Sequence, residues 1–107
     1  MSLKQLIQKK VIHAVNEEFE NAEIYLFGSQ ATNKSTADSD WDLLILLDVP
    51  TLSFDLETRL MNKLFDIELE TNQIISPLIY SKSKWTDTQS LSPLFNNIKN
   101  EGVRIQW

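Results

Sequence analysis

Residues 43–47 read Leu-Leu-Ile-Leu-Leu, and this apolar run constrains the fold more than any other part of the chain. Side chains alternate between the two faces of a β-strand, so a strand with this pattern is buried on both faces. We expect a central strand over residues 40–47 that starts at Asp40 and is ended by Asp48-Val49-Pro50. A strand of this kind requires a sheet with other elements packed against it.

Local patterns predict the elements around this strand. Helices are expected at residues 3–20, 54–70 and 92–102, and further strands at 23–27, 74–80 and 103–107. Pro77 cannot donate a backbone hydrogen bond, so its strand should lie at a sheet edge or carry a bulge. The order of elements predicts an α/β (α+β) fold, a small mixed sheet flanked by helices, with residues 1–107 forming a single domain.

Composition narrows the classes of function. The 107-residue chain has no cysteine, which excludes disulfides and thiolate zinc sites, and one histidine, His13, which the helical pattern places on the surface. The net charge of −5 is unfavourable for binding a nucleic-acid backbone. The sequence has no apolar run of the length that a membrane span needs, and residues 1–10 lack the apolar block of a signal peptide. We therefore expect a cytoplasmic location.

Asp40 and Asp42 are the strongest candidates for chemistry. Residues two apart in a strand share a face, so the two carboxylates should lie side by side where a buried strand begins. Like charges this close favour a bound cation, and carboxylate oxygens prefer hard ions such as Mg²⁺ or Mn²⁺. The alternative is that the two aspartates simply face water at the end of a strand.

Gly28 and Ser29 end the preceding predicted strand, where the loop to the aspartate pair begins. A glycine allows a phosphate to approach the backbone, and a serine hydroxyl with free N–H groups suits an anion. Alone, the pair could be an ordinary turn. Lys34 and Asp38 lie in the loop that follows and are interpreted as solvated residues. The alternative is that Lys34 contacts a phosphate and that Asp38 tunes the site.

Together these residues read Gly28-Ser29, ten residues, Asp40-Trp41-Asp42. With its flanking apolar strands, this pattern resembles the minimal nucleotidyltransferases of the DNA polymerase β-like nucleotidyltransferase superfamily. It is also similar to the N-terminal domain of kanamycin nucleotidyltransferase. The resemblance covers residues 3–80 approximately and implies the polymerase β-like nucleotidyltransferase fold.

The resemblance also implies roles for the site. Gly28 and Ser29 would hold the β- and γ-phosphates of ATP or another nucleoside triphosphate, and Asp40 and Asp42 would bind two divalent ions, Mg²⁺ or Mn²⁺. A nucleoside monophosphate would then pass to an acceptor hydroxyl. Relatives of this size pair with small helical HEPN toxins as antitoxins, which implies a HEPN-type partner and a homodimer or hetero-oligomer.

Two departures from the family pattern leave three functions open. First, the strand at residues 74–80 lacks the third carboxylate of the family, and Ser76 is the expected equivalent position. Second, Gln30 stands where many relatives have an arginine. The chain is therefore a catalytic transferase, a nucleotide- and partner-binding antitoxin module with weak or no turnover, or a small-molecule nucleotidyltransferase acting as a dimer.

Three further expectations concern apolar residues. Trp41 should face the side of the sheet opposite to the two aspartates and pack in the core. Trp85 and Trp107 are interpreted as packing residues, with stacking on a base as the alternative. Apolar residues at 54–69 cover a wide arc of a helix, which is either well buried or in contact with another chain.

Overall fold

The structure is a computed structural model that describes residues 2–28, 40–88 and 102–105. The predicted helix at residues 92–102 lies mostly outside these ranges. The elements are α1 (Leu3–Glu18), β1 (Glu23–Phe27), β2 (Trp41–Leu47), α2 (Phe54–Thr71), β3 (Ile75–Ser81), α3 (Lys82–Thr88) and β4 (Val103–Ile105). No helix within the described ranges has the length and apolar character needed to cross a membrane.

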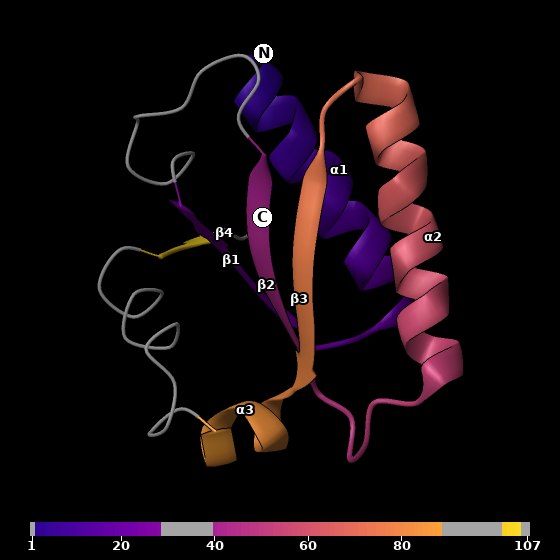
Figure 1. Ribbon diagram of the computed structural model, residues 1–107, viewed down its shortest axis with the longest axis vertical. Coiled ribbons are helices and arrows are strands. Elements are labelled where there is room, and N and C mark those ends of the chain that lie inside the picture. The colour runs from indigo at the N-terminus through magenta and orange to yellow at the C-terminus, as the bar shows by residue number, and fades with distance from the viewer. Residues whose placement is uncertain (1, 29–39, 89–101, 106–107) are drawn as a thin grey trace.

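The strands form a mixed sheet in the order β3-β2-β1-β4 (Figure 1). β2 pairs in parallel with β3 and antiparallel with β1, and β1 pairs antiparallel with β4. This arrangement confirms the predicted mixed sheet with flanking helices and the short C-terminal strand. Pro77 lies in β3, an edge strand, as its missing N–H requires.

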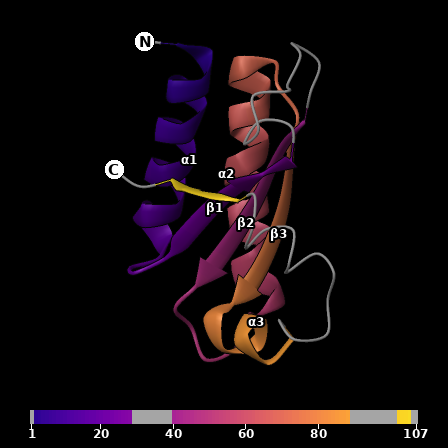
Figure 2. The same ribbon diagram turned by 90° about the vertical axis from the view of Figure 1, so that its left-hand side faces the viewer.

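β2 is buried on both faces, as its sequence predicts. Leu43, Ile45 and Leu47 pack into a core with buried residues of α1 and α2, which lie together on one side of the sheet (Figure 2). Leu44 and Leu46 point to the other face, where partly buried residues of β1, β3 and α3 cover them. The strand therefore fixes two hydrophobic layers at once.

Both long helices have well-defined ends. Ser2 and Gln5 form a reciprocal capping box at the start of α1, and the Ser53 hydroxyl accepts from the Leu56 N–H at 3.2 Å at the start of α2. α2 ends at Asn72, which adopts the left-handed conformation and donates its N–H to the Glu68 carbonyl at 2.8 Å. The predicted helix at 54–70 is thus correct to within one residue.

Several element boundaries differ from the sequence-based prediction by one or two residues. α1 ends at Glu18 rather than residue 20, because Phe19 turns to an extended backbone and buries its side chain in the core. β2 begins at Trp41 rather than Asp40, and β3 begins one residue later than expected, at Ile75. Ladder hydrogen bonds set these limits, whereas composition only places them approximately.

The short helix α3 was not predicted. It follows β3 directly, and the Ser81 hydroxyl accepts from the Lys84 N–H at 3.3 Å at its start. The Trp85 ring packs on Tyr80 with 5.4 Å between ring centroids. The signal for this helix was a serine cap, which the preceding apolar strand obscured. Trp85 is a packing residue here, as expected.

Ion pairs join α1 and α2 along their exposed sides. Lys63 contacts Glu17 at 2.7 Å and Arg59 contacts Glu18 at 3.1 Å. Lys10 contacts Glu70 at 2.6 Å, farther along the pair of helices. Such surface pairs contribute little stability individually, so the helices are held mainly by the core between them. His13 is exposed, as predicted, and contacts Glu17.

Of the two alternatives for residues 54–69, full burial is wrong for one side of the helix. Leu60, Leu64 and Ile67 are buried against the core. Other apolar residues of the same helix, including Phe65 and Leu69, are 55% and 68% exposed. The wide apolar arc in the sequence is therefore divided between a buried face and a solvent-facing one.

This division predicts different costs for adjacent substitutions. Leu60→Ala should lower the free energy of unfolding by about 2–5 kcal/mol, because a side chain with no exposed surface leaves a cavity. Met61→Ala, the matched control at 43% exposure, should change it by less than about 1 kcal/mol. Urea denaturation measures both values, and equal losses would contradict the assignment of the buried face.

Candidate active site

Trp41 anchors the two aspartates at the start of β2. Its indole is 2% exposed within the helix-side core, as predicted. Its backbone N–H donates to the Ile74 carbonyl at 2.8 Å, and its Nε1 donates to Gln73 Oε1 at 3.2 Å. Because side chains alternate along the chain here, Asp40 and Asp42 are directed away from this core.

Gly28 lies directly against the Asp42 carboxylate. Its neighbour Phe27 is opposite Asp42 in the β1–β2 register. Gly28 has a φ of +72°, and a Cβ atom at this position would overlap Asp42 Oδ2. Glycine is thus required here both by backbone conformation and by space. Ser29 lies outside the described residues, together with Gln30, Lys34 and Asp38.

Ser76 completes the group from the neighbouring strand. It is opposite Asp42 in the parallel β2–β3 register. Its hydroxyl donates to Asp40 Oδ2 at 3.4 Å. The structure therefore brings together Gly28, Asp40, Asp42 and Ser76 from three strand ends. Ser76 therefore lies beside the aspartate pair, on the strand next to it.

The two carboxylates repel each other electrostatically. Partial burial raises the pKa of Asp42 above its ordinary value, and the negative charge of Asp40 raises it further. Within residues 2–28, 40–88 and 102–105, no group of three or more histidine, cysteine or acidic side chains is placed to hold a metal. The donors present are two carboxylates and a hydroxyl, all hard oxygens, which fit Mg²⁺ or Mn²⁺ better than zinc.

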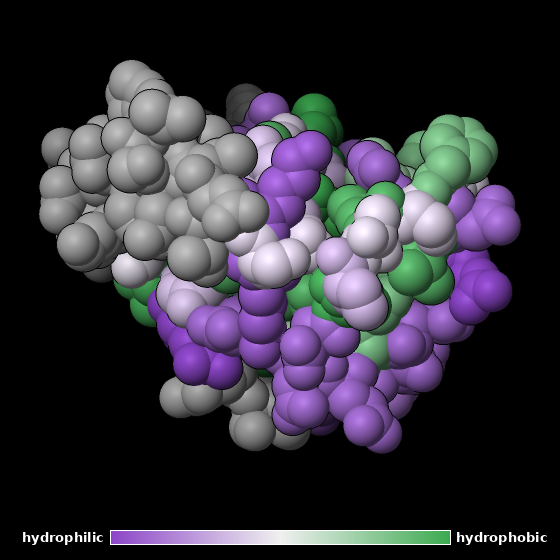
Figure 3. Space-filling view, turned by 90° about the horizontal axis from the view of Figure 1, so that it is seen from below, coloured by the Kyte–Doolittle hydropathy of each residue, from purple (hydrophilic) through white to green (hydrophobic). Residues whose placement is uncertain are grey.

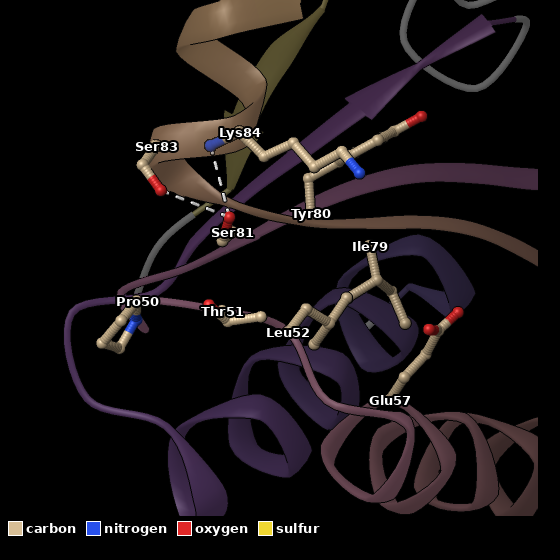
Figure 4. Close-up of a pocket in the computed structure, with 9 residues that line it drawn as sticks. All are labelled: Pro50, Thr51, Leu52, Glu57, Ile79, Tyr80, Ser81, Ser83 and Lys84. Atoms are coloured by element: carbon tan, nitrogen blue, oxygen red, sulfur yellow. Dashed lines mark hydrogen bonds between the residues drawn. The ribbon is translucent and has the colours of Figure 1, made fainter.

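A separate pocket of about 590 Å³ lies at the other end of β2 and β3 (Figure 4). Figure 3 views this end of the molecule, where hydrophobic surface lies between hydrophilic side chains. The residues that line the pocket come from the loop after β2 and from α2, β3 and α3: Pro50, Thr51, Leu52, Glu57, Ile79, Tyr80, Ser81, Ser83 and Lys84. None of the residues predicted to carry chemistry lines it, and its α3 wall was not foreseen.

The raised pKa of Asp42 makes a prediction about stability. A folded pKa above the ordinary value of 3.8 means that ionised Asp42 costs folding free energy, fully so above the raised pKa and not at all below the unfolded one. Without metal, Asp42→Asn should therefore raise the free energy of unfolding at pH 7, by less than about 1 kcal/mol because the carboxylate is partly solvated. The gain should shrink as the pH falls to about 4.

Urea denaturation at both pH values, in the presence of a chelator, measures this effect. Asp48→Asn is the matched control, since Asp48 is an exposed aspartate at the opposite end of the same strand. This control should change stability little at either pH. Destabilisation by Asp42→Asn at pH 7 would show that ionised Asp42 is not penalised by its surroundings.

Comparison with solved structures identifies several with this fold. A toxin–antitoxin structure with AMP-PNP has a TM-score of 0.64 at 17% identity, covering 92% of this chain and 72% of that one. The toxin–antitoxin MntA-HepT has a TM-score of 0.59 at 19% identity, covering 95% and 71%. The Shewanella oneidensis tri-AMPylated HEPN toxin in complex with MNT antitoxin has a TM-score of 0.60 at 20% identity, covering 96% and 71%.

At these identities the likeness shows a shared fold. Among curated proteins, none gives a significant match to the sequence. The family model described as "Polymerase beta, Nucleotidyltransferase" matches residues 9–103, which is most of the chain and includes β1, β2 and the aspartate pair. The resemblance drawn from the Gly-Ser and Asp-Trp-Asp motifs is thereby confirmed, and the chain belongs to the polymerase β nucleotidyltransferase family.

Proposed function

We propose that this protein transfers AMP from ATP to a hydroxyl group of a HEPN-type partner protein, with the help of divalent metal ions. The observation that carries the proposal is the closeness of Asp42 both to Asp40 and to Gly28, the glycine that follows β1. The two carboxylates offer ligands for a metal, and the glycine lets the backbone at the end of β1 approach Asp42 closely.

Asp40 and Asp42 would hold the metal. A cation would relieve their mutual repulsion, so metal binding would lower the electrostatic free energy of the site. Bound Mg²⁺ would polarise the α-phosphate and neutralise charge on the leaving pyrophosphate. Asp40 is exposed and Asp42 half-buried, which leaves the outer carboxylate accessible to an acceptor.

Gly28 and Ser29 would bind the triphosphate. Gly28 follows β1, has a positive φ and lies beside Asp42. Backbone N–H groups and a hydroxyl at such a position are suitable donors for phosphate oxygens. In the transfer, the acceptor oxygen forms a bond to the α-phosphorus, the bond to the bridging oxygen breaks, and pyrophosphate leaves.

The HEPN-type acceptor is suggested by the similar structures. One is a toxin–antitoxin structure with AMP-PNP, and another contains a tri-AMPylated HEPN toxin with an MNT antitoxin. By analogy, this protein would act as an antitoxin in the cytoplasm, with ATP as the nucleotide and a hydroxyl of the toxin as the acceptor.

Ser76 favours one alternative function. A serine hydroxyl is not a base at neutral pH, so it cannot take the proton of the acceptor as a third carboxylate would. The proton must then pass to Asp40 or to a group of the partner. If neither serves, the protein is a nucleotide-binding antitoxin that neutralises its partner by binding alone.

The proposed activity is tested by incubation with Mg²⁺, ATP and a purified HEPN-type protein. Mass spectrometry should detect a mass increase corresponding to added AMP on that partner. Asp42→Asn and Asp40→Asn should each reduce transfer at least about 100-fold, because removal of a charged metal ligand removes electrostatic stabilisation of the transition state. A chelator should abolish transfer by the wild type.

Asp48→Asn serves again as the control and should transfer AMP at the wild-type rate. Partner binding without any added AMP, unchanged in the Asp40→Asn/Asp42→Asn variant, would refute transfer and support the binding module.

Ser76 provides a test in the opposite direction. Ser76→Asp should increase AMP transfer by about tenfold or more, because a carboxylate in register with Asp42 adds a metal ligand and a base. The same substitution should tighten Mn²⁺ binding measured by calorimetry. Ser83→Asp, in an exposed position on α3, is the matched control. A Ser76→Asp variant with no gain in either measurement would show that the strand does not occupy the third-ligand position.

A further inference from the structure

One side of α2 carries apolar residues that the fold leaves uncovered. We call Phe54, Met61, Phe65 and Leu69 the α2 stripe. Their exposures are 82%, 43%, 55% and 68%. Successive members are separated by seven, four and four residues, so they align along one side of the helix.

The stripe runs along almost the whole of α2. From Phe54 to Leu69 it extends about 22 Å at the rise of an α-helix. Arg59 and Lys63 reach to α1 on another side of α2, and the helix lies at the outer edge of the molecule in Figure 1. Exposed apolar surface of this length and regularity is typical of a helix that packs against another helix.

The charges beside the stripe are acidic on both borders. At 100° per residue, Glu57 and Glu68 flank one border, and Asp55 and Asp66 flank the other. The basic residues of α2 are Arg59 and Lys63, both engaged by glutamates of α1. Over residues 54–71, five acidic and two basic side chains leave a net charge of −3.

These borders discriminate between possible occupants. If two copies of the chain packed stripe to stripe, acidic borders would face acidic borders in either orientation, which is unfavourable. A helix with an apolar face bordered by lysine and arginine would complement both the hydrophobic and the charged surface.

The stripe also leads towards the candidate active site. The chain leaves α2 through Asn72 and Gln73, and Gln73 accepts the hydrogen bond of Trp41 Nε1. Ile74, 57% exposed, accepts from the Trp41 N–H one residue from Asp40. A helix lying on the stripe would therefore end near the aspartate pair.

We propose that the α2 stripe is the docking surface for a partner protein's amphipathic helix whose apolar face is bordered by lysine and arginine. The inference rests on the proposed function only in that the docked protein is the acceptor of AMP. The docking itself requires neither metal nor nucleotide.

The test uses two synthetic amphipathic peptides of about 18 residues, each with leucines along one helical face. In one peptide lysines border the leucines, and in the other glutamates do. Fluorescence anisotropy without nucleotide should show the lysine peptide binding at least about tenfold more tightly, with an affinity that falls as salt increases. Equal binding of the two peptides, or none, would overturn the proposal.

Variants locate the binding surface. Phe65→Gln/Leu69→Gln should weaken binding of the lysine peptide at least about tenfold, and Asp55→Asn/Glu68→Gln should weaken it and reduce its salt dependence. The matched control is Leu3→Gln/Val103→Gln, which changes apolar residues that are 48% and 50% exposed elsewhere on the molecule. This control should bind as the wild type does, and equal losses in the two glutamine pairs would overturn the proposal.

Two further measurements separate this proposal from its alternatives. Asp40→Asn/Asp42→Asn should bind the lysine peptide normally, so that a failure of AMP transfer and a failure of docking are distinguishable. Sedimentation velocity should show no dimer that depends on the stripe. A wild-type dimer that Phe65→Gln/Leu69→Gln dissociates would overturn the proposal in favour of self-association.

Discussion

The burial of β2 on both faces is the constraint on which the rest of the structure depends. Leu43, Ile45 and Leu47 require a layer of helices, and Leu44 and Leu46 require a second cover on the opposite face. Because the strand is thereby fixed in position and register, its first residues are fixed as well. The hydrophobic core therefore places the aspartate pair, and hydrogen bonds of Trp41 and Ser76 add to it locally.

This arrangement explains how the domain tolerates a site that opposes its own stability. Asp42 has a raised pKa because it is partly buried and lies near Asp40. The unfavourable charge pair is offset by Trp41, which buries its indole and makes hydrogen bonds to the turn before β3. Core and site alternate residue by residue along the same strand, so the electrostatic strain at the aspartates is opposed by packing at their immediate neighbours.

The sequence was informative where a short pattern determines structure alone. The apolar run predicted β2, and Pro77 predicted that its strand lies at an edge or carries a bulge, of which the structure shows the edge position. Each prediction depends on a single physical requirement. The approach of Gly28 to Asp42 follows from pairing between strands and became visible only in three dimensions. α3 was missed because its start depends on the Ser81 hydroxyl, whose residue also ends β3. The exposure of one side of α2 was only one of two alternatives, because the sequence alone does not show whether an apolar residue faces the core or solvent.

The fold connects the Ser76 position with the α2 stripe. Ser76 gives the aspartate pair a hydroxyl on β3 in place of a carboxylate, and the α2 stripe is hydrophobic surface that is exposed in the described part of the chain. The turn from α2 into β3 connects them, because Ile74 follows the helix and bonds to Trp41 beside Asp40. A partner that covered the stripe would gain binding free energy from apolar contact along α2 and would reach the site at its end. Under this arrangement, the partner both positions its own hydroxyl and can supply the proton acceptor that Ser76 cannot provide.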